Sequence, residues 1–180
     1  MRLTRFINEV KMMDKTMIGF KIDPHSFTSI IKKISDILKN SNIHYEVIKD
    51  HHITIAQIVG KHPKDDIIRE INTIKGLKFK PKGISKIYGP LVKKDFIAIE
   101  YRINDKYINI FKEIAHKFDV RLFIGGPIPH ISIIKAEPNL ISDSLFDVIL
   151  SEIKSKLPLA IPDSVVLFNK KFQIEFEKDL

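Results

Sequence analysis

Two short motifs of the same form stand far apart in this chain. The first is HITI, beginning at His52, and the second is HISI, beginning at His130. Residues i and i+2 of a strand point to the same face. Each motif therefore places an imidazole beside the hydroxyl of Thr54 or Ser132 on one face, and two isoleucines on the other. An ordinary half-buried strand has no need of that polar pair.

These side chains suit the cleavage of a phosphodiester by in-line attack. One group must take a proton from the nucleophile and another must give a proton to the departing oxygen, and the pKa of histidine suits both tasks. Two hydroxyls can donate hydrogen bonds to non-bridging phosphate oxygens, which positions the phosphorus without a metal. We predict that His52, Thr54, His130 and Ser132 form one catalytic site. The sequence leaves open which histidine is the acid.

Two other interpretations compete with this one. Both histidines could be coincidental strand residues, but their matched placement in two isoleucine-alternating strands argues against coincidence. Two histidines on different strands could instead hold zinc. No Asp or Glu lies beside either motif in its strand. We therefore expect no metal and no cofactor.

The same order of elements leads up to each motif, namely a strand and then an amphipathic helix. Met17 precedes His52 at nearly the same spacing as Phe96 precedes His130. We interpret this as a diverged duplication and predict an α+β fold, with two pseudo-symmetric lobes of antiparallel sheet, helices on the outer faces and a central groove. The expected strands are residues 16–22, 45–48, 51–59, 77–88, 95–103, 129–136, 164–168 and 172–176. The expected helices begin at Ser26, at Pro63 and Asp65 together, at Asn104 or Asp105, and at Ser142.

The segments HHITIAQI and PHISIIKA resemble the two signatures of the 2H phosphoesterase superfamily, and the match spans residues 16–176. The resemblance implies a bilobed α/β fold and metal-independent chemistry on RNA-like phosphodiesters. It assigns the four catalytic roles to His52, Thr54, His130 and Ser132, and the superfamily accepts Ser in the second motif. Known branches act on 2′,3′-cyclic phosphates, on 2′-5′ linkages (the 2′-5′ RNA ligases), or on cyclic oligonucleotides.

Three further residues are candidates for substrate binding. Lys135 follows the second motif and could reach a phosphate, although odd parity along the strand would turn it away unless the strand bends. Tyr88, before Gly89 and Pro90, could stack on a base, and Phe20 on the first strand is a weaker candidate for stacking. Packing is the alternative role for both aromatic residues. His51 neighbours His52, but alternation sends it to the other face.

Composition limits the remaining possibilities. The 180 residues suit one bilobed domain over 16–180, preceded by an arm over 1–15. The absence of cysteine excludes disulfides and a cysteine nucleophile, and no apolar run is long enough to span a bilayer. We expect a soluble, cytoplasmic monomer with no membrane partner. The net charge of +8 suits a nucleotide or short RNA as substrate.

The arm carries one hint of origin. Residues 6–9 (FINE) resemble the cleavage signal of proteins packaged into the heads of T4-like phages. On that interpretation the chain acts in the host cytoplasm and belongs with the phage 2H enzymes that degrade cyclic nucleotide immune signals, the anti-CBASS branch. A plain N-terminal helix is the alternative. An inactive 2H-fold module that binds RNA is the rival function, and the intact motifs argue against it because a pure binder needs neither imidazole.

Overall fold

The computed structural model describes residues 15–59, 64–74, 76–89, 92–118, 121–122, 129–153, 157–169 and 173–180. The arm predicted over 1–15 lies outside these residues apart from Lys15, as does the segment 6–9. Among the described residues, no helix is long and apolar enough to cross a membrane.

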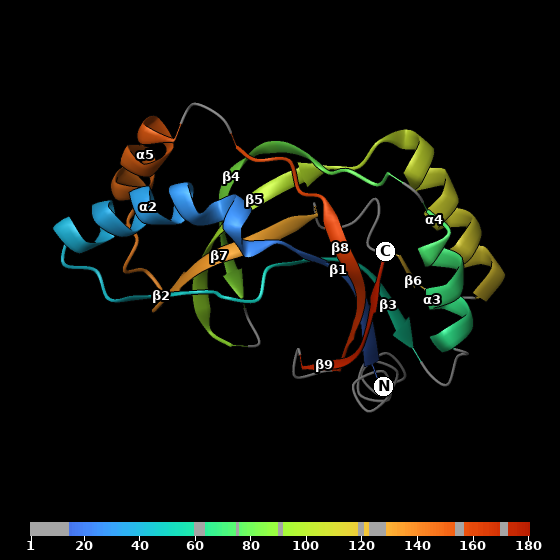
Figure 1. Cartoon of the computed structure of the whole chain (residues 1–180). Coiled ribbons are helices and arrows are strands. Elements are labelled where there is room, and N and C mark those ends of the chain that lie inside the picture. Colours follow the sequence, from blue (N-terminus) through green and yellow to red (C-terminus); the bar gives the residue numbers. More distant parts are fainter. Residues whose placement is uncertain are drawn as a thin grey trace, which may run out of the picture.

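The fold consists of two antiparallel sheets, which form two lobes with helices beside them (Figure 1). The first sheet has the strand order β6-β3-β1-β8-β9, and the second has the order β2-β7-β5-β4. The strands of the first sheet are β6 (Arg121–Leu122), β3 (His52–Val59), β1 (Lys15–Ile22), β8 (Pro162–Phe168) and β9 (Ile174–Asp179). Those of the second are β2 (Tyr45–Val47), β7 (His130–Ala136), β5 (Lys94–Arg102) and β4 (Lys80–Gly89). The predicted α+β class with two sheets is confirmed.

Each lobe is completed by elements from the other half of the chain. The short strand β2 precedes the first motif in sequence, yet it pairs with β7 of the second half. In return, β6 precedes the second motif and pairs with β3 of the first half. The helices follow the same exchange. Helix α2 (Thr28–Asn40) contacts α5 (Asp143–Glu152), whereas α3 (Lys64–Asn72) contacts α4 (Asp105–Phe118), at opposite ends of the molecule (Figure 1).

Helix starts follow the side chains available to cap them. Ser142 accepts a hydrogen bond from the Leu145 backbone N–H (3.2 Å), as predicted for α5. Of the two candidates for α4, Asn104 lies directly before the helix and accepts from the Lys106 N–H. The predicted cap at Ser26 is wrong.

The start of α2 is preceded by a single turn of 3₁₀ helix over Pro24–Phe27. Asp23 caps this turn by accepting a hydrogen bond from the His25 backbone N–H at 2.9 Å. Proline at the first helical position favours that start, because its missing N–H needs no partner there and its φ is already suitable. Helix α2 itself therefore begins only at Thr28.

The extended segment predicted over residues 77–88 corresponds to strand β4, Lys80–Gly89. Strand β4 is an edge strand whose register with β5 shifts between Pro81 and Gly83. An edge position suits proline, which cannot donate a hydrogen bond to a second neighbour. Strand β5 therefore stands between β4 and the motif strand β7.

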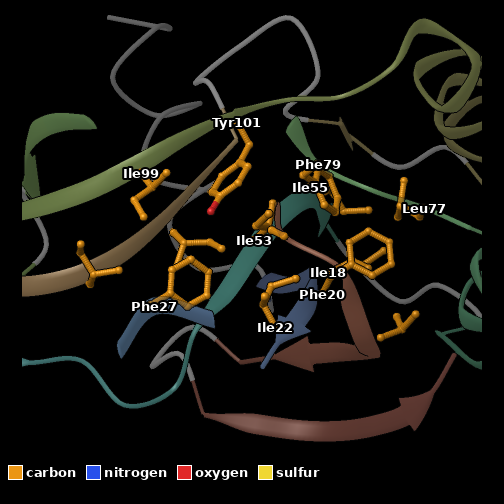
Figure 2. Packing of buried hydrophobic residues seen from close by; sticks show 14 of the residues in the cluster. Ile18, Phe20, Ile22, Phe27, Ile53, Ile55, Leu77, Phe79, Ile99 and Tyr101 are labelled. Atoms are coloured by element: carbon orange, nitrogen blue, oxygen red, sulfur yellow. The ribbon is translucent and has the colours of Figure 1, made fainter. Parts of the chain in front are cut away.

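One continuous core of apolar side chains joins the two lobes. Phe20 and Ile53 from the first sheet belong to the same cluster as Ile99 and Tyr101 from the second (Figure 2). All four are 0 to 1% exposed. Burial of this kind stabilises the fold by about 25 cal/mol per Å² of apolar surface removed from water. The shared core fixes the two motif strands relative to each other.

Candidate active site

The two motifs lie on strands that contact each other, β3 and β7. Along both strands the isoleucines at the second and fourth motif positions are 0 or 1% exposed. The histidines and hydroxyls between them are only partly buried. The alternation predicted from the sequence is therefore present on both strands. Its polar members, His52, Thr54, His130 and Ser132, stand on the faces away from the core.

The His130 imidazole is close enough to influence the charge of His52. Burial lowers the pKa of His52 below its ordinary value of 6.5, and the nearby His130 imidazole lowers it further. Repulsion between two cationic rings disfavours the doubly protonated state. A pair of histidines on opposite surfaces would show no such effect. The structure thus brings together side chains that are far apart in the sequence.

The His52 ring is held by a backbone carbonyl. Its Nδ1 atom lies 3.2 Å from the carbonyl oxygen of Asp50. A carbonyl oxygen can only accept a hydrogen bond, so Nδ1 carries the proton in this arrangement. In the neutral ring the lone pair then belongs to Nε2. This contact raises the pKa of His52, but the desolvation caused by burial is the larger influence and lowers it.

An aromatic ring also packs against His52. The Phe168 ring lies 4.4 Å from the imidazole between centroids, at a tilt of 43°. Gly19, opposite Thr54 in the β1–β3 register, leaves the room for it. A Cβ atom at Gly19 would lie 2.8 Å from the Ile53 carbonyl oxygen and 2.9 Å from the Phe168 ring. The imidazole is therefore positioned by both a hydrogen bond and a packed ring.

Each motif strand contains a β-bulge at the same position. Thr54 pairs with Gly19 and Ala56 pairs with Ile18, so Ile55 is the extra residue of β3. A bulge leaves one residue unpaired and shifts the alternation of the residues beyond it. Consistent with this, both Ile55 and Ala56 are buried, although they are neighbours in sequence.

The equivalent bulge in β7 changes the position expected for Lys135. Ser132 pairs with Ala98 and Ile134 pairs with Ile97, which leaves Ile133 as the extra residue. Beyond the bulge, Lys135 pairs with Phe96. Phe96 and Ala98 lie on one face of β5, so Lys135 shares the face of His130 and Ser132. The parity argument from the sequence fails here because the strand carries an additional residue.

The structure places the other predicted residues away from this face. Phe20 is 0% exposed and packs against Phe79 and Phe111, with centroids 5.7 and 6.1 Å away. This placement argues against stacking on a substrate base. Tyr88 is 53% exposed, but it pairs with the buried Asp95 and so lies on the opposite face of the sheet from His130.

His51 lies on the core side, as alternation predicted. It is 2% exposed and its ring meets the edge of Phe27 at 4.8 Å. Burial lowers the pKa of His51. Although it is the sequence neighbour of His52, it contributes no side chain to the polar face.

Two charged residues beside the motifs were not found by sequence reasoning. Lys21 stands directly opposite His52 in the register, and Glu100 stands directly opposite His130. Lys21 Nζ donates to Glu177 at 2.9 Å, which raises the pKa of Lys21. Glu100 forms an ion pair with Lys82 at 3.2 Å. The sequence did not predict these two residues because their proximity to the histidines depends on which residues pair across strands. The spacing of residues along one strand gives no information on that pairing.

Among the described residues, no three His, Asp or Glu side chains gather in a group that could hold a metal ion. The site face carries imidazoles, hydroxyls and ion-paired charges. Such a set can move protons and hold an anion.

Comparison with known proteins supports the fold. No protein-family model matches the chain, and no curated protein matches it in sequence. Two solved structures of Usb1 from Kluyveromyces marxianus are similar, each covering 92% of this chain and 98% of theirs at 9% identity. The TM-scores are 0.56 for Usb1 and 0.58 for Usb1 with uridine monophosphate. At this identity the likeness concerns the fold alone, an α+β arrangement of two antiparallel sheets.

Proposed function

We propose that the protein is a metal-independent phosphodiesterase that cleaves a phosphodiester next to a ribose in a small nucleotide or short RNA. The observation that carries the proposal is the pairing of the two motifs. Two imidazole–hydroxyl pairs lie on contacting strands, and the His130 imidazole lowers the pKa of His52. General acid–base catalysis needs two such groups within reach of one phosphate.

The surroundings of His52 favour the role of base. Its Nδ1–H is engaged by the Asp50 carbonyl, and its lowered pKa keeps the ring neutral at pH 7. Nε2 then takes the proton from a 2′-hydroxyl or a water. The new P–O bond forms as the bond to the leaving oxygen breaks, and His130 gives that oxygen its proton. Catalysis of this kind needs a base that is neutral and an acid that is protonated at the same pH.

Thr54 and Ser132 are assigned to the non-bridging oxygens of the phosphate. Each lies two residues after its histidine and directly before a bulge, opposite Gly19 or Ala98. Both side chains are partly exposed on the motif face. Donors fixed in advance stabilise the charge that develops in the transition state.

The proposal allows three kinds of ribonucleotide substrate, namely cyclic oligonucleotides, 2′,3′-cyclic phosphates and 2′-5′ linkages. One of the similar solved structures is Usb1 with uridine monophosphate, which supports a nucleotide ligand for this fold. The net charge of +8 favours a polyanion. Degradation of cyclic nucleotide immune signals by a phage protein would be one use of the same chemistry.

A panel of substrates tests the proposal. Purified protein is incubated with cyclic dinucleotides, 2′-5′ oligoadenylate, and oligonucleotides with a 3′-hydroxyl or a 2′,3′-cyclic phosphate, all with EDTA. We expect cleavage of at least one substrate in EDTA, and its loss in His52→Ala and in His130→Ala. The matched control is His25→Ala, an exposed histidine in the 3₁₀ turn.

Undiminished cleavage in either motif variant would sink the two-histidine mechanism. Binding without turnover across the whole panel would favour the inactive RNA-binding module. Activity that EDTA abolishes would show that a metal is required.

A further inference from the structure

The polar face does not end at the second motif. The bulge at Ile133 turns Lys135 onto the face of His130 and Ser132, and it places Phe96 beside Lys135 on the neighbouring strand. We infer that Phe96 and Lys135 form a subsite for the nucleotide next to the scissile phosphate, so that the substrate is an oligonucleotide rather than a mononucleotide. This inference rests on the proposed phosphodiesterase function.

Lys135 is suited to hold a phosphate. Its Nζ atom lies 3.0 Å from Glu46 Oε2, and the two side chains remain 36% and 66% exposed. An exposed ion pair of this kind is held weakly. A phosphate oxygen from the substrate can therefore replace the carboxylate. Lys135 also stands three residues beyond Ser132, and three residues of strand span about 10 Å, less the shortening from the bulge.

Phe96 is suited to hold a base. It is partly exposed on the motif face, and the cross-strand residue on its other side is Ile87. Its ring lies over Gly89, where a Cβ atom would come within 2.6 Å of the ring. Glycine at this position therefore lets the ring lie close to the sheet. An aromatic ring beside a cation is the combination that single-stranded nucleic acid sites use for base stacking and phosphate contact.

Among the described residues of the other lobe, the position equivalent to Phe96 holds no aromatic ring. Met17 occupies the register position equivalent to Phe96, two steps along β1 from the residue opposite Thr54. Its side chain offers no ring for stacking. The subsite therefore belongs to the lobe of the second motif, and it gives the substrate a direction across an otherwise pseudo-symmetric face.

Binding without turnover tests the inference. The His52→Ala protein is titrated by fluorescence anisotropy with labelled uridylates of one to four nucleotides. We expect affinity to rise at least tenfold from one nucleotide to the length that fills the subsite. Phe96→Ala in this background should lower the affinity of the longer ligands about tenfold and leave that of the mononucleotide unchanged. Lys135→Gln should also reduce the slope of log affinity against log salt by about 0.7.

A pair of variants separates substrate binding from structural support. If Lys135 binds phosphate, Lys135→Gln weakens oligonucleotide binding while Glu46→Gln strengthens it, because the competing carboxylate is removed. If the ion pair only supports the fold, both variants act in the same direction. The matched control is Lys86→Gln, which removes a lysine paired with Asp143 on the opposite face of the same sheet.

Equal affinity for one and four nucleotides would overturn the inference, as would parallel effects of Lys135→Gln and Glu46→Gln. This failure is distinct from failure of the proposed function. Length-dependent binding in a wild-type protein that turns over nothing would retain the subsite and reject the enzyme. Turnover without length-dependent binding would retain the enzyme and reject the subsite.

Discussion

The two lobes carry the same motif in different surroundings. Both have a histidine, a hydroxyl and a bulge at matching positions, and both place a small residue opposite the hydroxyl, Gly19 or Ala98. Opposite the histidines, however, Lys21 stands in the first lobe and Glu100 in the second. The shared features are those that acid–base chemistry on a phosphate needs. The divergent ones surround them and can give the two histidines different tasks.

The difference is also one of packing. His52 is held between the Asp50 carbonyl and the Phe168 ring, and its pKa is lowered chiefly by burial. Beyond the second motif, Lys135 and Phe96 lie on the same face as His130 and Ser132. Two matched motifs in unlike surroundings can contact the two sides of a substrate differently.

Removing either imidazole tests whether the lobes act as one site. We expect His52→Ala and His130→Ala each to lower kcat about 10⁴-fold, because each removes one of two coupled proton transfers. The double variant should lose little more, since the two residues act as a unit. In wild type, the rate should fall as pH drops below 6.5, where His52 takes up a proton. Single-turnover rates between pH 4.5 and 9 measure both effects. Retention of this acidic limb in His52→Ala would contradict the assignment of the base.

Removing either hydroxyl tests whether the lobes share the phosphate. Thr54→Val and Ser132→Ala should each lower kcat about 10²-fold, with KM changing much less, because the lost hydrogen bond strengthens in the transition state. The two variants should be alike, since both hydroxyls occupy the same place in the repeat. Steady-state kinetics give the comparison. A loss confined to KM would mean that the hydroxyls only bind the ground state.

Exchanging the small residues tests the packing around His52. Gly19→Ala introduces a methyl group at 2.8 Å from a backbone oxygen and 2.9 Å from Phe168, so the strand or the ring must move. We expect a loss of about 1–3 kcal/mol in the free energy of unfolding and a drop in kcat of roughly tenfold or more. The matched variant is Ala98→Gly, which adds no atoms and should change kcat less than twofold. Urea unfolding and kinetics on both proteins make the measurement.

The residues that precede His52 and His130 differ in how they affect stability at acidic pH. His51 is buried in the core with its pKa lowered, whereas Pro129 precedes His130 and does not titrate. Below pH 6.5, His51 binds a proton more readily in the unfolded chain than in the folded protein. The free energy of unfolding therefore falls as the pH drops below 6.5. His51→Phe should flatten the decline of Tm between pH 6.5 and 5. His25→Gln, at an exposed position, should leave the decline unchanged, and an equal flattening in both would rule out burial as the cause.

Much of the fold and the four motif residues followed from the sequence. Alternation of isoleucine with polar residues identified the faces of β3 and β7, and the capping serine at 142 marked the start of α5. These signals are local, because strand alternation and helix capping depend on residues within a few positions of each other. The cap at Ser26 was misplaced because Asp23 and Pro24 form a 3₁₀ turn first.

The chemistry available on each motif strand can be derived from the residues alone, because period-two alternation assigns side chains to faces within a regular strand. The surroundings of that chemistry depend on tertiary contacts. The bulges, which brought Lys135 to the motif face, appear in the pairing between strands. The exchange of β2 and β6 between lobes is likewise a matter of which strands meet. Which strands pair depends on how the whole chain packs around one core, and it cannot be predicted from the residues of a single strand.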